Sequence, residues 1–351
     1  MRYKLLGRSG LRVSELCLGT MTFGEDWSFG ASKEESKRVF DAFVDAGGNF
    51  LDTANFYTNG TSERFLSEFM GDRRQEFVLA TKYAFNDRPD DPNGGGNHRK
   101  SMHQALEASL KRLGTDYIDL YWVHAWDSMT PVDEVMRAFD DMVRVGKVLY
   151  VGISNAPAWI ISQANTLADL RGWSPFVGLQ IEYSLIERTP ERELLPMAKA
   201  LDIAVTAWSP LGGGMLTGKY KRNTEKPKDA RYAQGAWSED LFVTDKNFTI
   251  VEAVEKVAGE LDRTPAQVAI SWIRQQTGKG VIIPIIGARI LSQLQDNLAA
   301  LDFELSDDQL ACLDAVSAIQ LGFPYVFLNH DDVRPGLYGN RHALIDNHRG
   351  S

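Results

Sequence analysis

Cysteine and long apolar runs are both scarce in this chain. The 351 residues include only Cys17 and Cys312, which lie far apart, each within an apolar run. Two such residues do not form the disulfide framework of a secreted domain and indicate buried free thiols in a reducing compartment. No run reaches the roughly 18 apolar residues that a membrane span needs, and "MRYKLLGRSG" lacks the apolar core of a signal peptide. We therefore expect a cytoplasmic protein that does not enter a membrane.

Positive charge is also limited. Lysine and arginine total 38 against 47 acidic residues, which gives a net charge of −9 and a pI near 5.3. An acidic protein without a basic stripe is repelled by phosphate backbones and anionic lipids. We expect no nucleic-acid partner. The sequence leaves open whether the protein is a monomer or a homo-oligomer.

Several motifs that would indicate other chemistry are missing. The six histidines are scattered, and neither H-E-x-x-H nor C-x-x-C occurs, so no metal site is expected. The stretch "GGMLTGKY" nearly fits a phosphate-binding loop, but Tyr220 stands where the magnesium-ligating hydroxyl belongs. We interpret it as a flexible lid or a loop that contacts phosphate. No G-x-G-x-x-G follows an early strand, which disfavours an open doubly wound sheet.

Eight short, β-rich apolar runs are present instead. Several lack in/out alternation, as expected for parallel strands buried on both faces. The runs are "ELCLGTMTF", "NFLDTA", "FVLATKY", "IDLYWVHAW", "VLYVGISN", "VGLQIEYS", "IAVTAWSPL" and "GVIIPIIGA".

Helical segments alternate with these runs and carry clear start and stop signals. Ser32 with Glu35 predicts a capping box, Thr264-Pro265 a helix start and Gly114 a helix end. Other predicted starts are Thr130-Pro131, Asn155 with Pro157, and Thr189-Pro190. Because no linker interrupts the alternation, we predict one α/β domain over 1–351, a closed (β/α)8 TIM barrel.

Three parts fall outside the repeat. Residues 1–15 predict an N-terminal β-hairpin that plugs the floor of a barrel formed by 16–320. Long βα loops follow the third and seventh strands, and loops of such length are usually functional or mobile. The tail 321–351 is aromatic, shows no helical period and is expected to pack over a face of the barrel.

Polar residues close the early strands. Asp52, Lys82 and His124 end the second, third and fourth strands, and Tyr57 follows Asp52 in the loop. Active sites of β/α barrels lie at these strand ends. A nearby lysine would lower the tyrosine pKa, the aspartate would hold the lysine charged, and the histidine would bind a substrate oxygen. Such a set can protonate an oxygen that gains negative charge, as in carbonyl reduction.

Each of these residues also has an ordinary interpretation. Asp52 can close a turn, Tyr57 can be a loop aromatic, and His124 can be a satisfied core histidine. Lys82 is harder to explain this way, because a charge that ends a buried strand needs a partner. The joint arrangement on three consecutive strands is more specific than any single member.

The later strands end in groups suited to a flat ligand with an anionic end. Ser154, Asn155 and Gln180 suit a carboxamide, and Trp208 offers a face for a planar ring. Near the eighth strand, Gly287 and Arg289 precede a helix start, a combination that favours an anion such as phosphate.

The whole chain resembles the aldo-keto reductase family. The motifs "LGTMTFG", "FLDTANFY", "LATKY", "LYWVHAW", "GISN", "LQIEYSLIER", "TAWSPLGGGMLTGKY" and "GARILSQLQDN" follow family order and spacing. The chain most resembles the branch of bacterial reductases and potassium-channel β subunits. The resemblance implies a β/α barrel and hydride transfer from NADPH to an aldehyde or ketone.

The resemblance also implies roles for individual residues. The catalytic tetrad would be Asp52, Tyr57, Lys82 and His124, with Tyr57 as proton donor. Nicotinamide would contact Gly19, Thr20, Met21, Asp52, Ser154, Asn155, Gln180 and Trp208. Pyrophosphate would contact Ser209, Leu211, Gly212 and Lys219. Adenosine would contact Gly287, Arg289, Gln293 and Asn297. The stretch "PIIGAR" lacks the lysine or serine often found before the arginine, so NADPH is favoured and NADH is possible.

An aromatic mouth is expected for the substrate. Its predicted walls are Phe23, Trp27, Tyr57, Phe85, Trp126 and Tyr325. This suits a small-molecule carbonyl compound, and small aldehydes, quinone-like ketones and sugar-derived carbonyls remain open. The alternative is an NADPH-binding, redox-sensing regulatory subunit with slow turnover. A metal-dependent barrel hydrolase is a third reading, but it predicts a histidine and aspartate cluster that the sequence lacks.

Overall fold

The structure is a computed structural model that describes residues 1–27, 29–222 and 243–346. It divides into two compact units, Met1–Ser317 and Ala318–Ser351. The predicted loop after the seventh barrel strand runs into residues 223–242, which lie outside the described residues.

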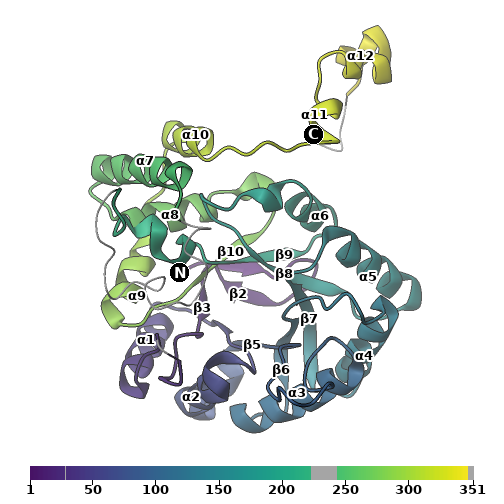
Figure 1. Ribbon diagram of the computed structural model, residues 1–351, viewed down its shortest axis with the longest axis vertical. Helices are drawn as coiled ribbons and strands as arrows, with labels where there is room; N and C mark the ends of the chain where they lie inside the picture. The colour runs from purple at the N-terminus through teal and green to yellow at the C-terminus, as the bar shows by residue number, and fades with distance from the viewer. Residues whose placement is uncertain (28, 223–242, 347–351) are drawn as a thin grey trace. The chain divides into compact units, whose positions relative to one another are not determined.

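Eight parallel strands close into a barrel in the first unit (Figure 1). All eight predicted runs form these strands, so the predicted TIM barrel is confirmed. The strands are β3 (Cys17–Gly19), β4 (Phe50–Asp52), β5 (Val78–Tyr83), β6 (Ile118–Val123), β7 (Val148–Ser154), β8 (Phe176–Glu182), β9 (Ala204–Trp208) and β10 (Ile282–Ile286). The barrel closes where β10 pairs with both β9 and β3.

Helices surround the barrel (Figure 1). They are α1 (Lys33–Asp45), α2 (Thr61–Met70), α3 (Arg99–Leu113), α4 (Val132–Arg144), α5 (Ala158–Arg171), α6 (Leu194–Ala200), α7 (Asp245–Leu261), α8 (Pro265–Arg274), α9 (Leu291–Leu298) and α10 (Asp307–Val316). Most of them bury their apolar faces toward the strands, whereas α7 packs on α8, and α10 packs on α7. No described helix is both long and apolar enough to cross a bilayer.

The predicted helix signals are met to different degrees. Thr264 caps α8 with a complete capping box, and Gly114 ends α3 in the left-handed conformation. Ser32 caps α1 through the Glu35 backbone N–H, but the Glu35 carboxylate bonds elsewhere, so its capping box is half formed. The residues before α4 and α5 are prolines that make no side-chain cap.

The N-terminal hairpin lies at the floor of the barrel. Strands β1 (Tyr3–Leu5) and β2 (Arg12–Ser14) pair antiparallel. Leu6 and Val13 join the cluster of inward-facing barrel residues. Gly7 has a φ of +56°, and a Cβ there would lie 2.5 Å from the Val177 carbonyl oxygen, at the start of β8. The hairpin therefore packs against the amino-terminal ends of the strands, opposite the site.

Trp122 fills the barrel interior beneath the strand ends. It pairs in register with Lys82 on one side and Gly152 on the other. A Cβ on Gly152 or Gly178 would lie 2.4 Å or 2.7 Å from the Trp122 ring. These two glycines make room for the indole, which supports the layer that carries the site.

The second unit contains two short helices, α11 (Tyr325–Leu328) and α12 (Val333–Tyr338). The sequence predicted no helical structure here, because four or six residues are too short for an apolar period to show. Many of its apolar side chains are exposed. They are Phe323, Val326, Phe327, Leu328, Leu337, Tyr338, Leu344 and Ile345.

Candidate active site

The carboxyl ends of the strands bring the predicted residues together at one rim. Consecutive strands contribute side chains from positions that are in register, such as Gly19 with Asp52 and Ser154 with Gln180. Tyr57 follows β4 after four residues and begins the turn Tyr57–Gly60, which leads into α2.

Lys82 is the centre of a buried hydrogen-bond cluster. Its Nζ lies 2.5 Å from Asp52 Oδ2, 2.8 Å from the Thr53 carbonyl oxygen and 3.0 Å from the Tyr57 hydroxyl. Gln180 Nε2 donates to the other Asp52 oxygen at 2.9 Å. Lys82 is fully buried, and its three donors are all used. The cluster is therefore held in place before any substrate binds.

The charges in the cluster set the protonation states. Burial alone would lower the pKa of Lys82, but the charge of Asp52 and the interactions with Asp52 and Tyr57 raise it overall, so the ammonium stays charged. Burial raises the pKa of Tyr57, and the opposing effect of Lys82 does not overcome it. Lys82 therefore acts in the expected direction, but the tyrosine pKa is raised overall and not lowered. The reason is that burial of the phenol has the largest effect, and the Asp52 charge also disfavours a phenolate.

His124 faces the phenol from the neighbouring strand end. Its ring lies 5.8 Å from the Tyr57 ring, edge to face. Burial, followed by the Lys82 charge, holds the pKa of His124 well below its usual range. The imidazole is therefore neutral at physiological pH and can hold an oxygen by a hydrogen bond without being a cation.

Aromatic rings line the approach to the phenol. Trp27 contacts both Phe56 and Tyr57, at 5.5 Å and 6.4 Å between ring centroids. Phe85 lies 5.7 Å from Phe56 and 4.4 Å from His124. Phe56 was not predicted, although its place beside Tyr57 in "NFYTNG" was a usable signal.

The other residues predicted to line the substrate mouth lie elsewhere or are untested. Phe23 is fully buried and packs on Phe69 of α2, so it belongs to the core and does not line the mouth. In the segment that follows β3, the Phe23 side chain points toward α2. Trp126 is partly buried against the core. Tyr325 belongs to the second unit, and its contribution stays a prediction.

Strands β7 to β9 present polar atoms that have no partner within the described residues. Ser154 Oγ and Glu182 Oε1 are both buried and unbonded there. Trp208 lies next to Glu182 in register and is half-buried. Its Nε1 donates to Asn155 Oδ1 at 3.2 Å. A planar carboxamide ligand stacked on Trp208 would supply the missing hydrogen bonds, so this rim fits a nicotinamide ring.

Some predicted cofactor residues have other bonds. Asn155 Nδ2 donates to the His124 carbonyl oxygen at 2.9 Å, so Asn155 joins Trp208 to the end of β6. The Thr20 hydroxyl donates to the Asp52 carbonyl oxygen at 3.0 Å and is fully buried. Gly19 and Met21 flank it, with Gly19 packed so closely on Ile285 that a Cβ would lie 2.7 Å away.

The turn after β9 fits a pyrophosphate. Ser209, Gly212 and Gly214 are all left-handed, and Leu211 N–H and carbonyl groups lie within this tight turn. A Cβ on Gly214 would lie 2.9 Å from Lys219 Nζ, so the ammonium lies directly over the glycine backbone. The N–H groups of Gly212, Gly214 and Leu216 already donate within the turn, so the Lys219 ammonium is the group of this turn that would contact phosphate oxygens.

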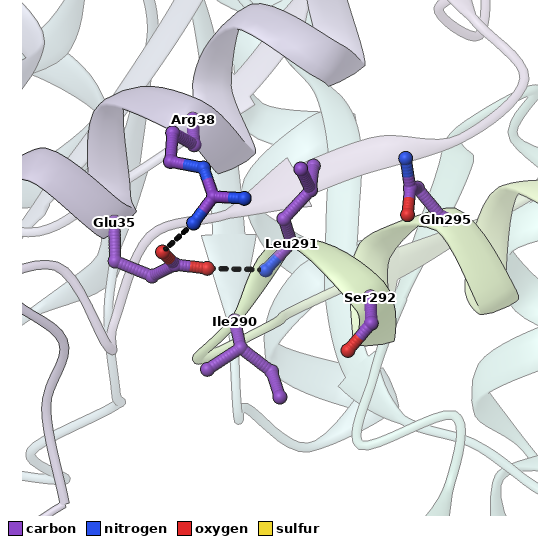
Figure 2. Close-up of a pocket in the computed structure, with 6 residues that line it drawn as sticks. All are labelled: Glu35, Arg38, Ile290, Leu291, Ser292 and Gln295. Atoms are coloured by element: carbon purple, nitrogen blue, oxygen red, sulfur yellow. Dashed lines mark hydrogen bonds and ion pairs between the residues drawn. The ribbon is translucent and has the colours of Figure 1, made fainter.

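The residues after β10 form a connected group. Arg289 N–H donates to Gln293 Oε1 at 2.9 Å, and Asn297 Nδ2 donates to the Gly287 carbonyl oxygen at 3.3 Å. Figure 2 shows that Glu35 already occupies the start of α9: its carboxylate accepts from Leu291 N–H at 2.6 Å and pairs with Arg38. An anion bound near Arg289 would share this helix start with an intrinsic carboxylate. The adenosine contacts stay predictions.

Two other features bear on the chemistry. No group of three potential metal ligands occurs among the described residues. Cys17 is buried inside the barrel, where desolvation raises the pKa of its thiol well above the usual value. The thiol is therefore unreactive, and the rim carries the candidate chemistry.

Comparisons with known proteins agree with this geometry. The sequence profile of the Aldo/keto reductase family matches residues 15–318. The chain is 38% identical to norsolorinic acid reductase stcV of Emericella nidulans, over 91% of this chain and 82% of that protein. It is 37% identical to aryl-alcohol dehydrogenase [NADP(+)] of Phanerodontia chrysosporium, over 90% and 86%. It is 35% identical to the putative aryl-alcohol dehydrogenase AAD14 of Saccharomyces cerevisiae, over 94% and 90%.

The profile covers almost the whole barrel, and the relatives match over nearly their full lengths. The chain therefore belongs to the aldo/keto reductase family and is an NADP-dependent oxidoreductase.

Proposed function

We propose that this enzyme reduces aromatic aldehydes and ketones to alcohols with NADPH, and that Tyr57 is the proton donor. The observation that carries the proposal is the 3.0 Å contact between Lys82 Nζ and the Tyr57 hydroxyl, with Asp52 holding the lysine from behind. The alternative from the sequence, a redox-sensing subunit, has no structural feature of its own in support.

The protein supplies acid catalysis and positioning. Trp208 and Ser154 would hold the nicotinamide cofactor, which would supply a hydride to the carbonyl carbon when bound. Tyr57 donates a hydrogen bond to the carbonyl oxygen and transfers its proton as that oxygen becomes negative. Lys82 then stabilises the phenolate. Neutral His124 holds the same oxygen from the other side.

The raised pKa of Tyr57 keeps the phenol protonated at physiological pH, as a proton donor must be, but it also makes the phenol a weaker acid than a free tyrosine. The developing negative charge on the substrate oxygen provides the driving force for transfer, and the nearby ammonium stabilises the product state.

The aromatic approach indicates the substrate class. Trp27, Phe56 and Phe85 form a connected set of rings that leads to His124 and Tyr57. Such a wall favours a flat, apolar carbonyl compound over a sugar. The names of the relatives, aryl-alcohol dehydrogenase and norsolorinic acid reductase, support the same class.

The test is to measure turnover of a panel of aryl aldehydes, aromatic ketones and sugar aldehydes. Turnover is monitored through the absorbance of the reduced nicotinamide, once with NADPH and once with NADH. We expect Tyr57→Phe to lower kcat by a factor of order 10² to 10⁴ with cofactor affinity kept. Tyr3→Phe, at an exposed hydroxyl bonded to the Gly47 carbonyl oxygen, is the matched control. Full turnover by Tyr57→Phe would remove the phenol from the mechanism. Tight cofactor binding without turnover of any compound would favour the sensor.

A further inference from the structure

The chain has an unusual backbone directly after Tyr57. Thr58 has φ 44° and ψ 45°, Asn59 has φ 53° and ψ 35°, and Gly60 has φ 83°. Three consecutive left-handed residues are rare, and the conformation is especially unfavourable for a β-branched threonine. Backbone of this kind persists only where the surrounding structure enforces it.

The Thr58 hydroxyl enforces it through two hydrogen bonds. It donates to the Phe23 carbonyl oxygen at 2.6 Å and accepts from Ser62 N–H at 3.1 Å. Thr58 is fully buried. A Cβ on Gly24 would lie 3.0 Å from Thr58 Cβ, so the side chain is enclosed on that side as well. The hydroxyl therefore ties the left-handed turn to the loop after β3 and to the start of α2.

The hydrogen bonds that start at Thr58 extend through Ser62 to the end of β4, which carries Asp52. Ser62 Oγ lies 2.8 Å from Thr20 Oγ1 and 2.9 Å from Thr53 Oγ1. Thr20 Oγ1 in turn donates to the Asp52 carbonyl oxygen at 3.0 Å. One group of buried hydroxyls thus connects the turn after Tyr57 to the Asp52 carbonyl group and to the side chain of the next residue, Thr53.

The left-handed turn adjoins the phenol directly. The Tyr57 ring lies over Lys82, with Nζ 4.6 Å from the ring centroid, and against Trp27, and the left-handed residues begin at the next position. A turn of the ordinary hand at Thr58 would send the following residues in another direction and carry the phenol with them.

We propose that Thr58 is a positioning residue that holds the Tyr57 hydroxyl at Lys82 by stabilising this left-handed turn. The proposal rests on the proposed role of Tyr57 as proton donor. It assigns to Thr58 no contact with substrate or cofactor. Its effect belongs to the proton-transfer step, because a displacement of about 1 Å at a reacting group is sufficient to lower a rate by about 10²-fold.

Four substitutions at Thr58 distinguish the effect of its hydroxyl from the effect of its left-handed backbone. Thr58→Val keeps the shape and loses both hydrogen bonds, and Thr58→Ala loses them with less crowding. Thr58→Ser keeps the hydroxyl. Thr58→Gly loses the hydroxyl, but glycine adopts the left-handed conformation without assistance. We expect Val and Ala to lower kcat by about 10- to 100-fold, and Ser and Gly to stay within about threefold of the unchanged enzyme.

The measurements are kcat, KM, NADPH affinity by fluorescence and the solvent deuterium isotope effect on kcat. We expect the isotope effect to rise in Thr58→Val, because proton transfer becomes slower, while NADPH affinity stays within about threefold. A loss confined to stability would leave kcat of the folded fraction and the isotope effect unchanged. Thermal unfolding shows which variants are folded. If Thr58→Val does not fold, Thr58→Ala takes its place in the comparison.

The order of kcat among the four Thr58 variants tests the proposal. If folded Thr58→Val and Thr58→Ala retain full kcat, or if Thr58→Gly is as impaired as they are, the proposal is wrong. Tyr57→Phe keeps this result separate from the proposed function. An inactive Tyr57→Phe with an active Thr58→Val refutes only the positioning role, whereas an active Tyr57→Phe refutes the proton-donor role itself.

Discussion

The two halves of the rim differ in how far their charged groups are satisfied. On the side of β4 to β6, both Asp52 oxygens and all three Lys82 donors have protein partners. Three other buried atoms on this side, Asn55 Oδ1, Trp122 Nε1 and His124 Nδ1, have none among the described residues. On the side of β7 to β9, Ser154 Oγ, Glu182 Oε1 and Thr206 Oγ1 are buried without a partner in the described part of the chain. The Asp52–Lys82 cluster is therefore fully bonded before any ligand binds, whereas we expect a ligand to supply partners to the atoms on the side of β7 to β9.

The largest expected effect comes from breaking the satisfied half. Lys82→Met leaves the Asp52 carboxylate buried without a cation, which typically costs about 3 to 5 kcal/mol of the free energy of unfolding. Turnover should also be lost, because no ammonium stabilises the phenolate. Denaturant unfolding and turnover measure the two effects.

A double variant separates the two consequences of that change. Asp52→Asn with Lys82→Met removes both charges, so most of the lost stability should return while turnover stays absent. A single Lys82→Met variant as stable as the unchanged enzyme would contradict the view that this half is held together by its buried charge pair.

An intermediate effect, on how stability depends on pH, is expected at Glu182, on the side of β7 to β9. Burial, with a contribution from the charge of Glu187, raises the pKa of Glu182 to about 7. Because the folded state binds this proton more tightly than the unfolded chain, the stabilising contribution is full below about pH 4.5 and is lost as the pH rises through 7. We expect the free energy of unfolding of the cofactor-free enzyme to fall by roughly 1 to 3 kcal/mol across that range.

Glu182→Gln should remove most of that pH dependence, because glutamine does not titrate. Glu187→Gln is the matched control: it should narrow the pH range of the fall without abolishing it. Chemical denaturation at a series of pH values measures both. An unchanged pH profile in Glu182→Gln would mean that another group is responsible.

The smallest effect is expected at Ser154. Its hydroxyl has no partner among residues 1–27, 29–222 and 243–346, so Ser154→Ala should change the stability of the cofactor-free enzyme by less than about 0.5 kcal/mol. NADPH affinity should fall by about 2- to 10-fold, the equivalent of one hydrogen bond. Fluorescence titration and thermal unfolding test the two statements.

Thr81→Val is the matched control, because the Thr81 hydroxyl is already bonded to buried Glu63 at 2.6 Å. It should lower stability by about 1 to 3 kcal/mol and leave NADPH affinity unchanged. The reverse pattern in the two variants would remove the distinction between the satisfied and unsatisfied halves.

Much of the fold and the tetrad was predictable from local patterns. The eight apolar runs all form barrel strands, because strands buried on both faces leave a continuous signal. Asp52, Lys82 and His124 converge because parallel strands bring their carboxyl ends to one rim. The capping box at Thr264 was also correct, since its partner Gln267 lies within the same turn.

Errors arose where a side chain has more than one possible environment. Phe23 was assigned to the mouth but is in the core, because the sequence near a strand end does not show which way the ring turns. Glu35 fitted the second half of a capping box, yet its carboxylate bonds Leu291, 256 residues further along the chain. The pKa of Tyr57 was expected to be lowered and is raised, because the burial of the phenol, which has the largest effect, is not a local property.

By itself, the order of apolar runs, glycines and strand-ending polar residues determined the barrel, the rim and the residues that meet there, because these depend on short-range periodicity and on a simple topology. The tertiary structure alone decided which polar atoms are satisfied, which stay unpaired, and how the left-handed turn at Thr58 directs the phenol. Hydrogen bonding and desolvation depend on distances of a few tenths of an ångström between segments far apart in the chain, and only the folded structure sets those distances.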